Sequence, residues 1–310
     1  MEFRNLGRSG LKVSEISLGG WLTYGGSVGD DTAKTCIRTA IEQGINFIDL
    51  ADAYARGDAE RVVGELLPEY KRSDLVISSK LYWPMSEDVN NRGLSRKHIL
   101  ESVEASLERL GTDYLDIYFC HRYDEETPVA ETVRAMSDLV QQGKVLYWGT
   151  SAWEAEQIEN ALGAADQYLA YRPQVEQPRY NMIDRHIEES VMPTCAEHGL
   201  GLVVWSPLAQ GILTGKYNDG MPEGTRGAST SWLDGELTEG NIKKVRKLKV
   251  IASDRDISMA QLALAWILYH PEISSVITGA SRPQQVIDNV AASGINLTDD
   301  VYAEIEAILA

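Results

Sequence analysis

The feature that most constrains this chain is an alternation of short apolar runs with amphipathic stretches along most of its 310 residues. The runs are rich in β-branched and aromatic residues, which favour strands, and the stretches carry apolar residues at helical spacing. Such alternation is typical of repeated βαβ units on a parallel sheet. Candidate strands lie at residues 14–20, 45–50, 75–80, 114–121, 145–151, 173–177, 201–206 and 274–281.

Strands and helices in this order predict an α/β fold, the (β/α)8 TIM barrel, formed by residues 1–310 as a single domain. Residues 207–257 are too long for one loop between a strand and a helix. Their first part is rich in Gly, Ser and Thr and predicts a functional loop, and residues 238–254 predict an extra helix after strand 7. Residues 298–310 predict a C-terminal closing helix. Several helical patterns are followed by glycines that we expect to form left-handed caps, namely Gly44, Gly111, Gly143 and Gly199.

Charge and composition exclude several classes of protein. The 46 acidic and 29 basic residues give a net charge of -17, which repels nucleic-acid phosphates and anionic membrane surfaces. No apolar run approaches the roughly 20 residues that cross a bilayer, and the N-terminal segment lacks the apolar stretch of a signal peptide. We therefore expect a cytoplasmic protein with no nucleic-acid partner and no membrane insertion. The acidity fits a well-solvated surface, and adaptation to high salt stays an open alternative.

Three cysteines are widely spaced in apolar stretches, at Cys36, Cys120 and Cys195. An odd number without clustering does not suggest a disulfide framework. We expect all three to be reduced residues of the core.

Ionisable side chains mark the carboxyl ends of neighbouring strands, which in a barrel face one shared cleft. Asp49, Lys80 and His121 end successive strands, and Tyr54 follows Asp49 by five residues. Lys80 could lower the pKa of the Tyr54 phenol, and Asp49 could hold Lys80 as an ion pair. His121 could donate a hydrogen bond to the carbonyl oxygen that Tyr54 protonates. Each residue alone could be a loop cap or a core residue, but the four together favour a catalytic site.

Other motifs point away from phosphate transfer and from metal catalysis. Residues 211–217 contain a Gly-Lys pair, but the spacing is one residue short of a P-loop, and Tyr217 replaces the Ser or Thr that binds magnesium. The 5 histidines include no HExxH pair and the cysteines form no cluster, so we expect no metal. There is no GxGxxG segment, and we expect no Rossmann domain.

Three segments, FIDLADAY, VISSK and DIYFCH, resemble the signature segments of the aldo-keto reductases. Longer segments, such as RNLGRSGLKVSEISLGGWLTYGG and VVWSPLAQGILTGKY, resemble the β subunits of voltage-gated potassium channels and their prokaryotic relatives. The resemblance covers nearly the whole chain. It implies a barrel that binds NADP (NADPH) in an extended pose, with a tetrad of Asp49, Tyr54, Lys80 and His121. It also implies a homo-oligomer of four or more subunits.

The resemblance further implies which residues bind the cofactor. In the family, Gln177 contacts the nicotinamide amide and Trp205 lies beside the ring. The residue types agree, since Lys216 and Arg226 lie in a Gly-rich stretch and could close on a phosphate. Arg282 precedes a helix N-terminus, which favours an anion. The implied set is Gly20, Trp21, Asp49, Ser151, Gln177, Trp205, Ser206, Pro207, Leu208, Ala209, Gln210, Lys216, Arg226, Gly279, Ser281, Arg282, Gln285, Asp288 and Asn289.

The implied function is NADPH-dependent reduction of aldehydes or ketones to alcohols, with Tyr54 as general acid. The alternative is a redox-responsive subunit that binds NADP to regulate a channel-like partner. Where the channel β subunits carry Asn, this chain has His121, which favours the enzyme. Where they carry Thr and Arg, it has Gly20 and Ala152, so its cofactor affinity is expected to differ.

Aromatic residues near the predicted cleft could form an apolar substrate pocket, and packing in the core or on the surface is an equal alternative for each. The sequence does not identify the natural carbonyl substrate. The candidate pocket residues are Trp21, Tyr24, Trp83 and Tyr123.

Overall fold

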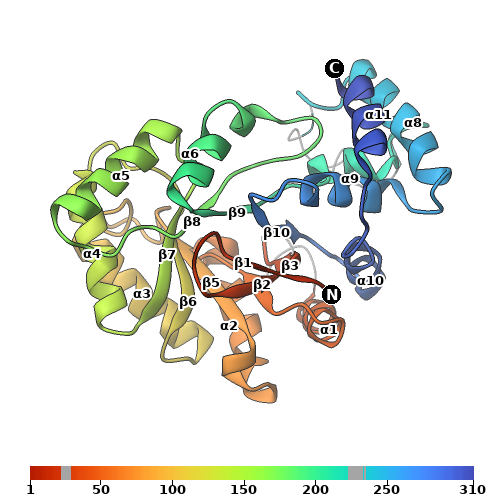
Figure 1. The fold of residues 1–310 in the computed structure, drawn as a ribbon. Helices are drawn as coiled ribbons and strands as arrows, with labels where there is room; N and C mark the ends of the chain where they lie inside the picture. The colour runs from red at the N-terminus through yellow and green to blue at the C-terminus, as the bar shows by residue number, and fades with distance from the viewer. Residues whose placement is uncertain (22–28, 223–232, 234) are drawn as a thin grey trace.

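The computed structural model describes residues 1–21, 29–222, 233 and 235–310. Parallel strands close into a barrel, with β10 paired to β3, and helices surround it (Figure 1). This confirms the predicted (β/α)8 barrel. The barrel strands are β3 (Ile16–Gly19), β4 (Phe47–Asp49), β5 (Val76–Leu81), β6 (Leu115–Cys120), β7 (Val145–Ser151), β8 (Val175–Gln177), β9 (Gly201–Val204) and β10 (Ile273–Thr278).

Amphipathic helices connect the strands and cover the outside of the barrel. The four predicted glycine caps all have positive φ, from 63° at Gly111 to 88° at Gly44, a conformation that glycine adopts without strain. The helices are α1 (Asp30–Glu42), α2 (Asp58–Gly64), α3 (Arg96–Leu110), α4 (Val129–Gln141), α5 (Ala155–Gln167), α6 (Val191–His198), α9 (Met259–Leu268) and α10 (Pro283–Val290). Short 3-10 turns are η2 (Tyr54–Gly57), η3 (Leu67–Glu69), η4 (Arg72–Asp74), η5 (His186–Glu188) and η6 (Ala209–Thr214).

Two helices lie outside the regular alternation, as the sequence predicted. The extra helix is α8 (Glu239–Ser253), which follows the seventh barrel strand, and the C-terminal helix is α11 (Asp299–Leu309). They contact each other and lie side by side in Figure 1. Thr238 caps α8 by accepting a hydrogen bond from the Asn241 backbone, which explains why the helix begins there.

An N-terminal hairpin, which the sequence analysis did not predict, covers one end of the barrel. Strands β1 (Phe3–Asn5) and β2 (Lys12–Ser14) are antiparallel. Leu6 and Val13 of this segment are fully buried, in one cluster with barrel residues such as Phe47 and Val203. The hairpin therefore seals the end at which the strands begin, and leaves the carboxyl ends of the strands for the site.

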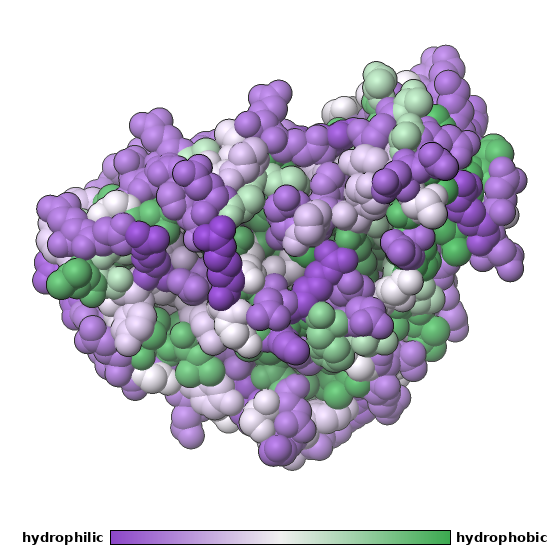
Figure 2. All heavy atoms as spheres, in the orientation of Figure 1, coloured by the Kyte–Doolittle hydropathy of each residue, from purple (hydrophilic) through white to green (hydrophobic). Residues whose placement is uncertain are grey.

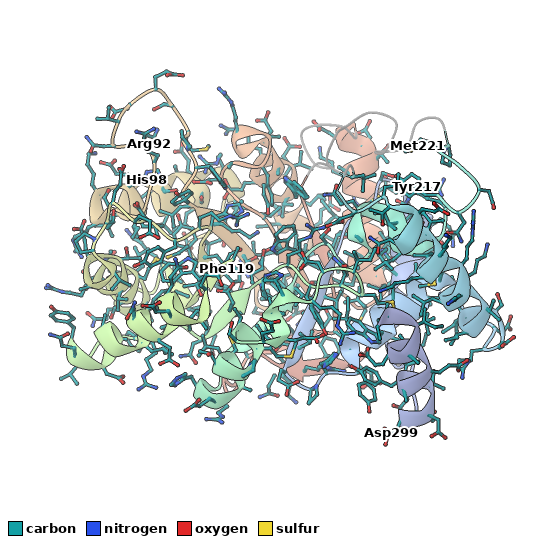
Figure 3. The ribbon with its side chains drawn as sticks, turned by 90° about the horizontal axis from the view of Figure 1, so that it is seen from above. Arg92, His98, Phe119, Tyr217, Met221 and Asp299 are labelled. Carbon is teal, nitrogen blue, oxygen red and sulfur yellow. The ribbon has the colours of Figure 1, made fainter. Side chains whose placement is uncertain are left out.

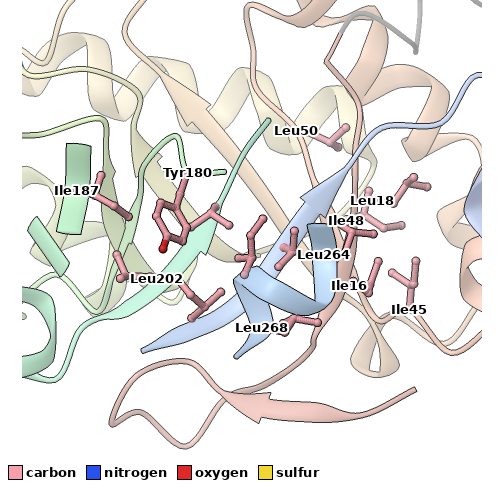
Figure 4. Close-up of a cluster of buried hydrophobic side chains, with 14 of the residues drawn as sticks. Ile16, Leu18, Ile45, Ile48, Leu50, Tyr180, Ile187, Leu202, Leu264 and Leu268 are labelled. Carbon is pink, nitrogen blue, oxygen red and sulfur yellow. The ribbon is translucent and has the colours of Figure 1, made fainter. Parts of the chain in front are cut away.

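The main core lies between the strands and the helices. Figure 4 shows part of it, with Leu264 and Leu268 of α9 beside the strands of the barrel. Burying an aliphatic side chain of this size stabilises the fold by about 1.5 to 3 kcal/mol. Cys36, Cys120 and Cys195 are buried and free, which confirms their place in the core. In Figure 3, Phe119 lies among the barrel strands.

The visible face of the molecule is largely hydrophilic. Hydrophilic residues cover much of the face in Figure 2, and hydrophobic residues appear between them in patches. Within the described ranges, no helix combines the length and the apolar character needed to cross a bilayer.

Candidate active site

Three elements bring polar side chains together at the carboxyl end of the barrel. Asp49 ends β4, Lys80 lies in β5, and Tyr54 begins the turn η2. Lys80 Nζ lies 2.6 Å from Asp49 Oδ2 and 3.1 Å from the Tyr54 hydroxyl oxygen. Carboxylate, ammonium and phenol thus form one connected chain.

Buried hydrogen bonds hold the ion pair in place. Asp49 Oδ1 accepts from Ser78 Oγ at 2.7 Å and from Gln177 Nε2 at 2.9 Å. Lys80 also donates to the Leu50 carbonyl at 2.6 Å, and its side chain is 0% exposed. Burial favours the neutral amine, but the Asp49 carboxylate and the Tyr54 phenol outweigh it, so the pKa of Lys80 is raised. Lys80 is therefore a fixed ammonium.

The pKa of Tyr54 corrects one expectation from the sequence. Burial of the phenol outweighs the stabilising charge of Lys80, and the Asp49 charge adds to burial, so the pKa of Tyr54 is raised rather than lowered. The side chain is a neutral phenol near pH 7. It keeps the proton that a general acid must deliver, while the adjacent ammonium can stabilise the phenolate left behind.

His121 follows β6 directly and completes the group. Its ring lies edge-on to the Tyr54 ring, with centroids 5.9 Å apart, and it is 7% exposed. Burial, then the charges of Lys80 and Arg122, hold the pKa of His121 well below its ordinary value. The imidazole is therefore neutral and has one N–H to donate. Its Nδ1 has no hydrogen-bond partner among the described residues, so the ring has hydrogen-bonding capacity for a ligand.

Left-handed backbone conformations cluster beside these strand ends. Ala55 and Arg56, just after Tyr54, have φ of 48° and 54°, and Ser206 and Gln210, after β9, have φ of 58° and 55°. Each such residue costs on the order of 1 to 3 kcal/mol, and such strain gathers at functional sites.

Comparison with known proteins decides the family. The sequence model of the aldo/keto reductase family matches residues 15–310. This chain belongs to the aldo/keto reductase family. A protein from Arabidopsis thaliana named "Probable voltage-gated potassium channel subunit beta" is 45% identical over 100% of this chain and 97% of its own length. One of the same name from Oryza sativa subsp. japonica is 44% identical with the same coverage. Both parts of the predicted resemblance are confirmed.

Many of the residues that the resemblance assigns to an aldo/keto reductase cofactor lie at or after the ends of adjacent strands β7 to β10, while Gly20 and Trp21 follow β3 and Asp49 ends β4. Ser151 ends β7 and donates to the backbone carbonyl of Gln177, which ends β8, at 2.9 Å. Trp205 follows β9, and its ring centroid lies 6.3 Å from that of Trp21. Gln210 Oε1 is buried without a hydrogen-bond partner among the described residues. An orphaned buried acceptor is costly, and it fits a site that a polar ligand completes.

The end of β10 fits the phosphate side of such a ligand. The Ser281 N–H and Oγ both donate to Gln285 Oε1, at 2.8 and 3.1 Å. Arg282 is exposed at the start of α10, where a helix N-terminus and a cation favour an anion. Lys216 is exposed, with its Nζ 5.0 Å from the centroid of the Tyr217 ring.

The other predicted cofactor positions differ in how far they are buried. Buried positions are Gly20, Pro207, Ala209 and Asn289, partly buried ones are Ser206 and Leu208, and exposed ones are Gly279 and Asp288. Arg226 lies outside the described residues.

The described substrate-pocket candidates have different aromatic neighbours. The Trp83 ring centroid lies 6.2 Å from that of His121, and Trp83 is 41% exposed. Trp21 packs near Trp205 instead, and Tyr123 packs on the buried Trp153 with centroids 4.8 Å apart. Tyr24 lies outside the described residues. Trp83 therefore lies beside His121 of the tetrad.

The sequence analysis missed two residues of this site. Ser78 donates a hydrogen bond to Asp49. It lies two residues before Lys80, so the two side chains share one face of the strand, and this spacing is the signal that could have identified Ser78. Arg122 was missed because it belongs to no motif, although it directly follows His121.

Features elsewhere are separate from the tetrad. A cavity of about 400 Å³ lies beside Asp52 and α3, and one of about 670 Å³ lies next to the N-terminal hairpin. Neither is lined by a tetrad residue. The described part of the chain holds no group of three His, Cys, Asp or Glu side chains that could bind a metal ion.

Proposed function

We propose that this aldo/keto reductase is an NADPH-dependent enzyme that reduces aldehydes or ketones to alcohols, with Tyr54 as the proton donor. The observation that carries the proposal is the contact of 3.1 Å between the Tyr54 hydroxyl and the Lys80 ammonium. Because the phenol is neutral and the amine is charged, the pair is prepared to release one proton.

The side chains of the tetrad have distinct roles in this proposal. When bound, NADPH supplies the hydride, which the carbonyl carbon accepts. As the C=O π bond opens, the oxygen takes the Tyr54 proton, and Lys80 stabilises the phenolate that remains. Neutral His121 donates a hydrogen bond to the same oxygen and orients it. Asp49 acts on Lys80 and keeps its ammonium directed at Tyr54.

Residues at the ends of β7 to β10 would hold the cofactor. Ser151, Gln177 and Gln210 offer polar groups, and Trp205 offers an aromatic face. Arg282 at the start of α10 supports NADP over NAD, since the 2′-phosphate adds an anion that a helix N-terminus and a guanidinium both favour. The three buried free cysteines fit a reducing compartment, so the cytoplasm is the proposed location. An assembly of four or more subunits stays a prediction.

A panel of aldehydes and ketones tests the proposal, with turnover followed by the loss of NADPH absorbance. At least one carbonyl compound should be reduced, and the alcohol product should appear in equal amount. Tight NADPH binding with no turnover of any panel member would contradict it.

The names of the relatives favour a second candidate, a redox-responsive subunit that binds NADP to regulate a channel-like partner. This role predicts tight cofactor binding with very slow hydride transfer. His121 favours the enzyme, because a neutral imidazole beside Tyr54 can donate to a carbonyl oxygen.

A further inference from the structure

Arg122 lies at the edge of the tetrad, directly after His121. Its Nη1 donates to the His121 backbone carbonyl, and its Cζ lies 5.8 Å from the centroid of the Trp83 ring. The same Trp83 ring lies 6.2 Å from the His121 ring. Guanidinium, indole and imidazole therefore form one group beside the tetrad.

This arginine differs from the other partly buried arginines of the described chain. Each of the other partly buried arginines pairs with a carboxylate. These arginines are Arg4, Arg38, Arg72, Arg109, Arg179 and Arg185. No carboxylate of the described residues lies within ion-pair distance of Arg122. The chain has 46 acidic residues, so a shortage of acids does not explain this.

The acid that acts on Arg122 from nearby does not neutralise it. Glu176 is fully buried, and it accepts hydrogen bonds from Thr150 Oγ at 2.5 Å and from the Trp153 backbone at 3.3 Å. Burial raises the pKa of Glu176 to about 7, so much of it carries a proton near neutral pH. Arg122 is therefore a partly desolvated cation with donors to spare, which an incoming anion would stabilise.

From this geometry we propose that Arg122 binds a carboxylate on the substrate, so the enzyme prefers aldehydes or ketones that carry an acid group. The inference rests on the proposed reductase function and names its substrate class. A guanidinium fork matches a carboxylate in two hydrogen bonds. Trp83 offers a half-exposed aromatic face for the hydrocarbon between the carbonyl and the acid. Lys80 cannot take this role, because its donors are bound to Asp49, Leu50 and Tyr54.

A matched pair of substrates tests the charge alone. 4-Carboxybenzaldehyde and methyl 4-formylbenzoate present the same aldehyde, but only the first is an anion. The wild type should show a kcat/KM about 10 to 100 times higher for the acid, the range of a charge-assisted hydrogen bond. Arg122→Met should remove this preference mainly through KM, with the ester changed less than about threefold. Arg122→Lys, which keeps the charge and loses the fork, should recover part of it.

Arg92→Met is the matched control, because it removes the same charge from an exposed loop at the edge of the molecule (Figure 3). It should keep the preference of the wild type. Equal kcat/KM for the two aldehydes in the wild type would overturn the inference. A loss of NADPH affinity in Arg122→Met, with both aldehydes slowed equally, would also overturn it and assign Arg122 to the cofactor.

Product binding separates this inference from the reductase function. If no carbonyl compound is reduced, the proposed function fails, and calorimetry of 4-(hydroxymethyl)benzoate with NADP-loaded protein still tests Arg122. The wild type should then bind this acid about tenfold or more tightly than Arg122→Met does. Equal affinity would overturn the substrate-class inference independently of turnover.

Discussion

Asp52→Asn should remove a large part of the pH dependence of stability. Asp52 is fully buried, its Oδ2 accepts from Ser102 at 3.0 Å, and its Oδ1 has no partner among the described residues. Nearby Glu60 is also buried and pairs with Arg109. Burial first, and then the charge of Glu60, raise the pKa of Asp52 to about 7 from an ordinary 3.8.

The direction of the effect follows from proton linkage. Between pH 3.8 and about 7 the folded state holds the Asp52 proton while the unfolded state has released it. Stability therefore falls as pH rises through this window. The rise of the Asp52 pKa from 3.8 to about 7 corresponds to a total loss of about 4 kcal/mol of stability with rising pH, of which roughly 2 to 3 kcal/mol is lost between pH 5 and pH 7.

Urea unfolding at pH 5, 6, 7 and 8, followed by tryptophan fluorescence, measures the effect. Over this pH range, the free energy of unfolding of the wild type should fall by about 2 to 3 kcal/mol more than that of Asp52→Asn. Burial also raises the pKa of Glu176 to about 7. In both proteins Glu176 should therefore still make the free energy of unfolding fall as pH rises. Glu87→Gln removes a carboxylate from an exposed position and controls for net charge. Parallel curves for Asp52→Asn and the wild type would refute the reasoning.

Three further predictions test the site. Lys80→Met should destabilise the fold by about 3 to 5 kcal/mol in urea unfolding, because it leaves Asp49 buried and unpaired. Adding Asp49→Asn should recover part of the loss, whereas strictly additive losses would contradict the pairing. His121→Asn should lower kcat about 100-fold or more and leave the Kd for NADPH within twofold; the reverse pattern would assign His121 to the cofactor. NADPH should bind at least about tenfold more tightly than NADH, since Lys216 and Arg282 add positive charge near the expected 2′-phosphate, and equal Kd values would exclude this preference.

The barrel could be predicted because its strands leave a strong pattern. Buried parallel strands such as residues 115–120 and 201–204 read as short, mainly apolar runs, and glycines at 44 and 111 mark the helix ends. The N-terminal hairpin could not be predicted, because each of its strands has only three residues and shows no clear alternation. Its role depends on Leu6 and Val13 meeting the barrel interior, which is a long-range contact.

The candidate site was partly predictable for a similar reason. Asp49, Lys80 and His121 lie at strand ends, and the order of strands in a barrel makes them neighbours. The direction of the Tyr54 pKa was predicted wrongly, because it depends on how far burial outweighs the charge of Lys80, and the sequence does not contain that balance. The isolation of Arg122 from every described carboxylate is likewise a property of the folded chain.

Single-turnover hydride transfer in Tyr54→Phe tests the central claim most directly. Protein loaded with NADPH is mixed with the aldehyde that the wild type reduces fastest, and the loss of NADPH absorbance is followed by stopped flow. Tyr54→Phe removes the transferable proton and keeps the ring, so the rate should fall by about 10² to 10⁴ while the Kd for NADPH is unchanged. Tyr70→Phe, at a phenol whose charged neighbours are Glu69, Arg38 and Glu42 and not the tetrad, should react as the wild type does. A Tyr54→Phe rate equal to that of the wild type would contradict the assignment of Tyr54 as the proton donor.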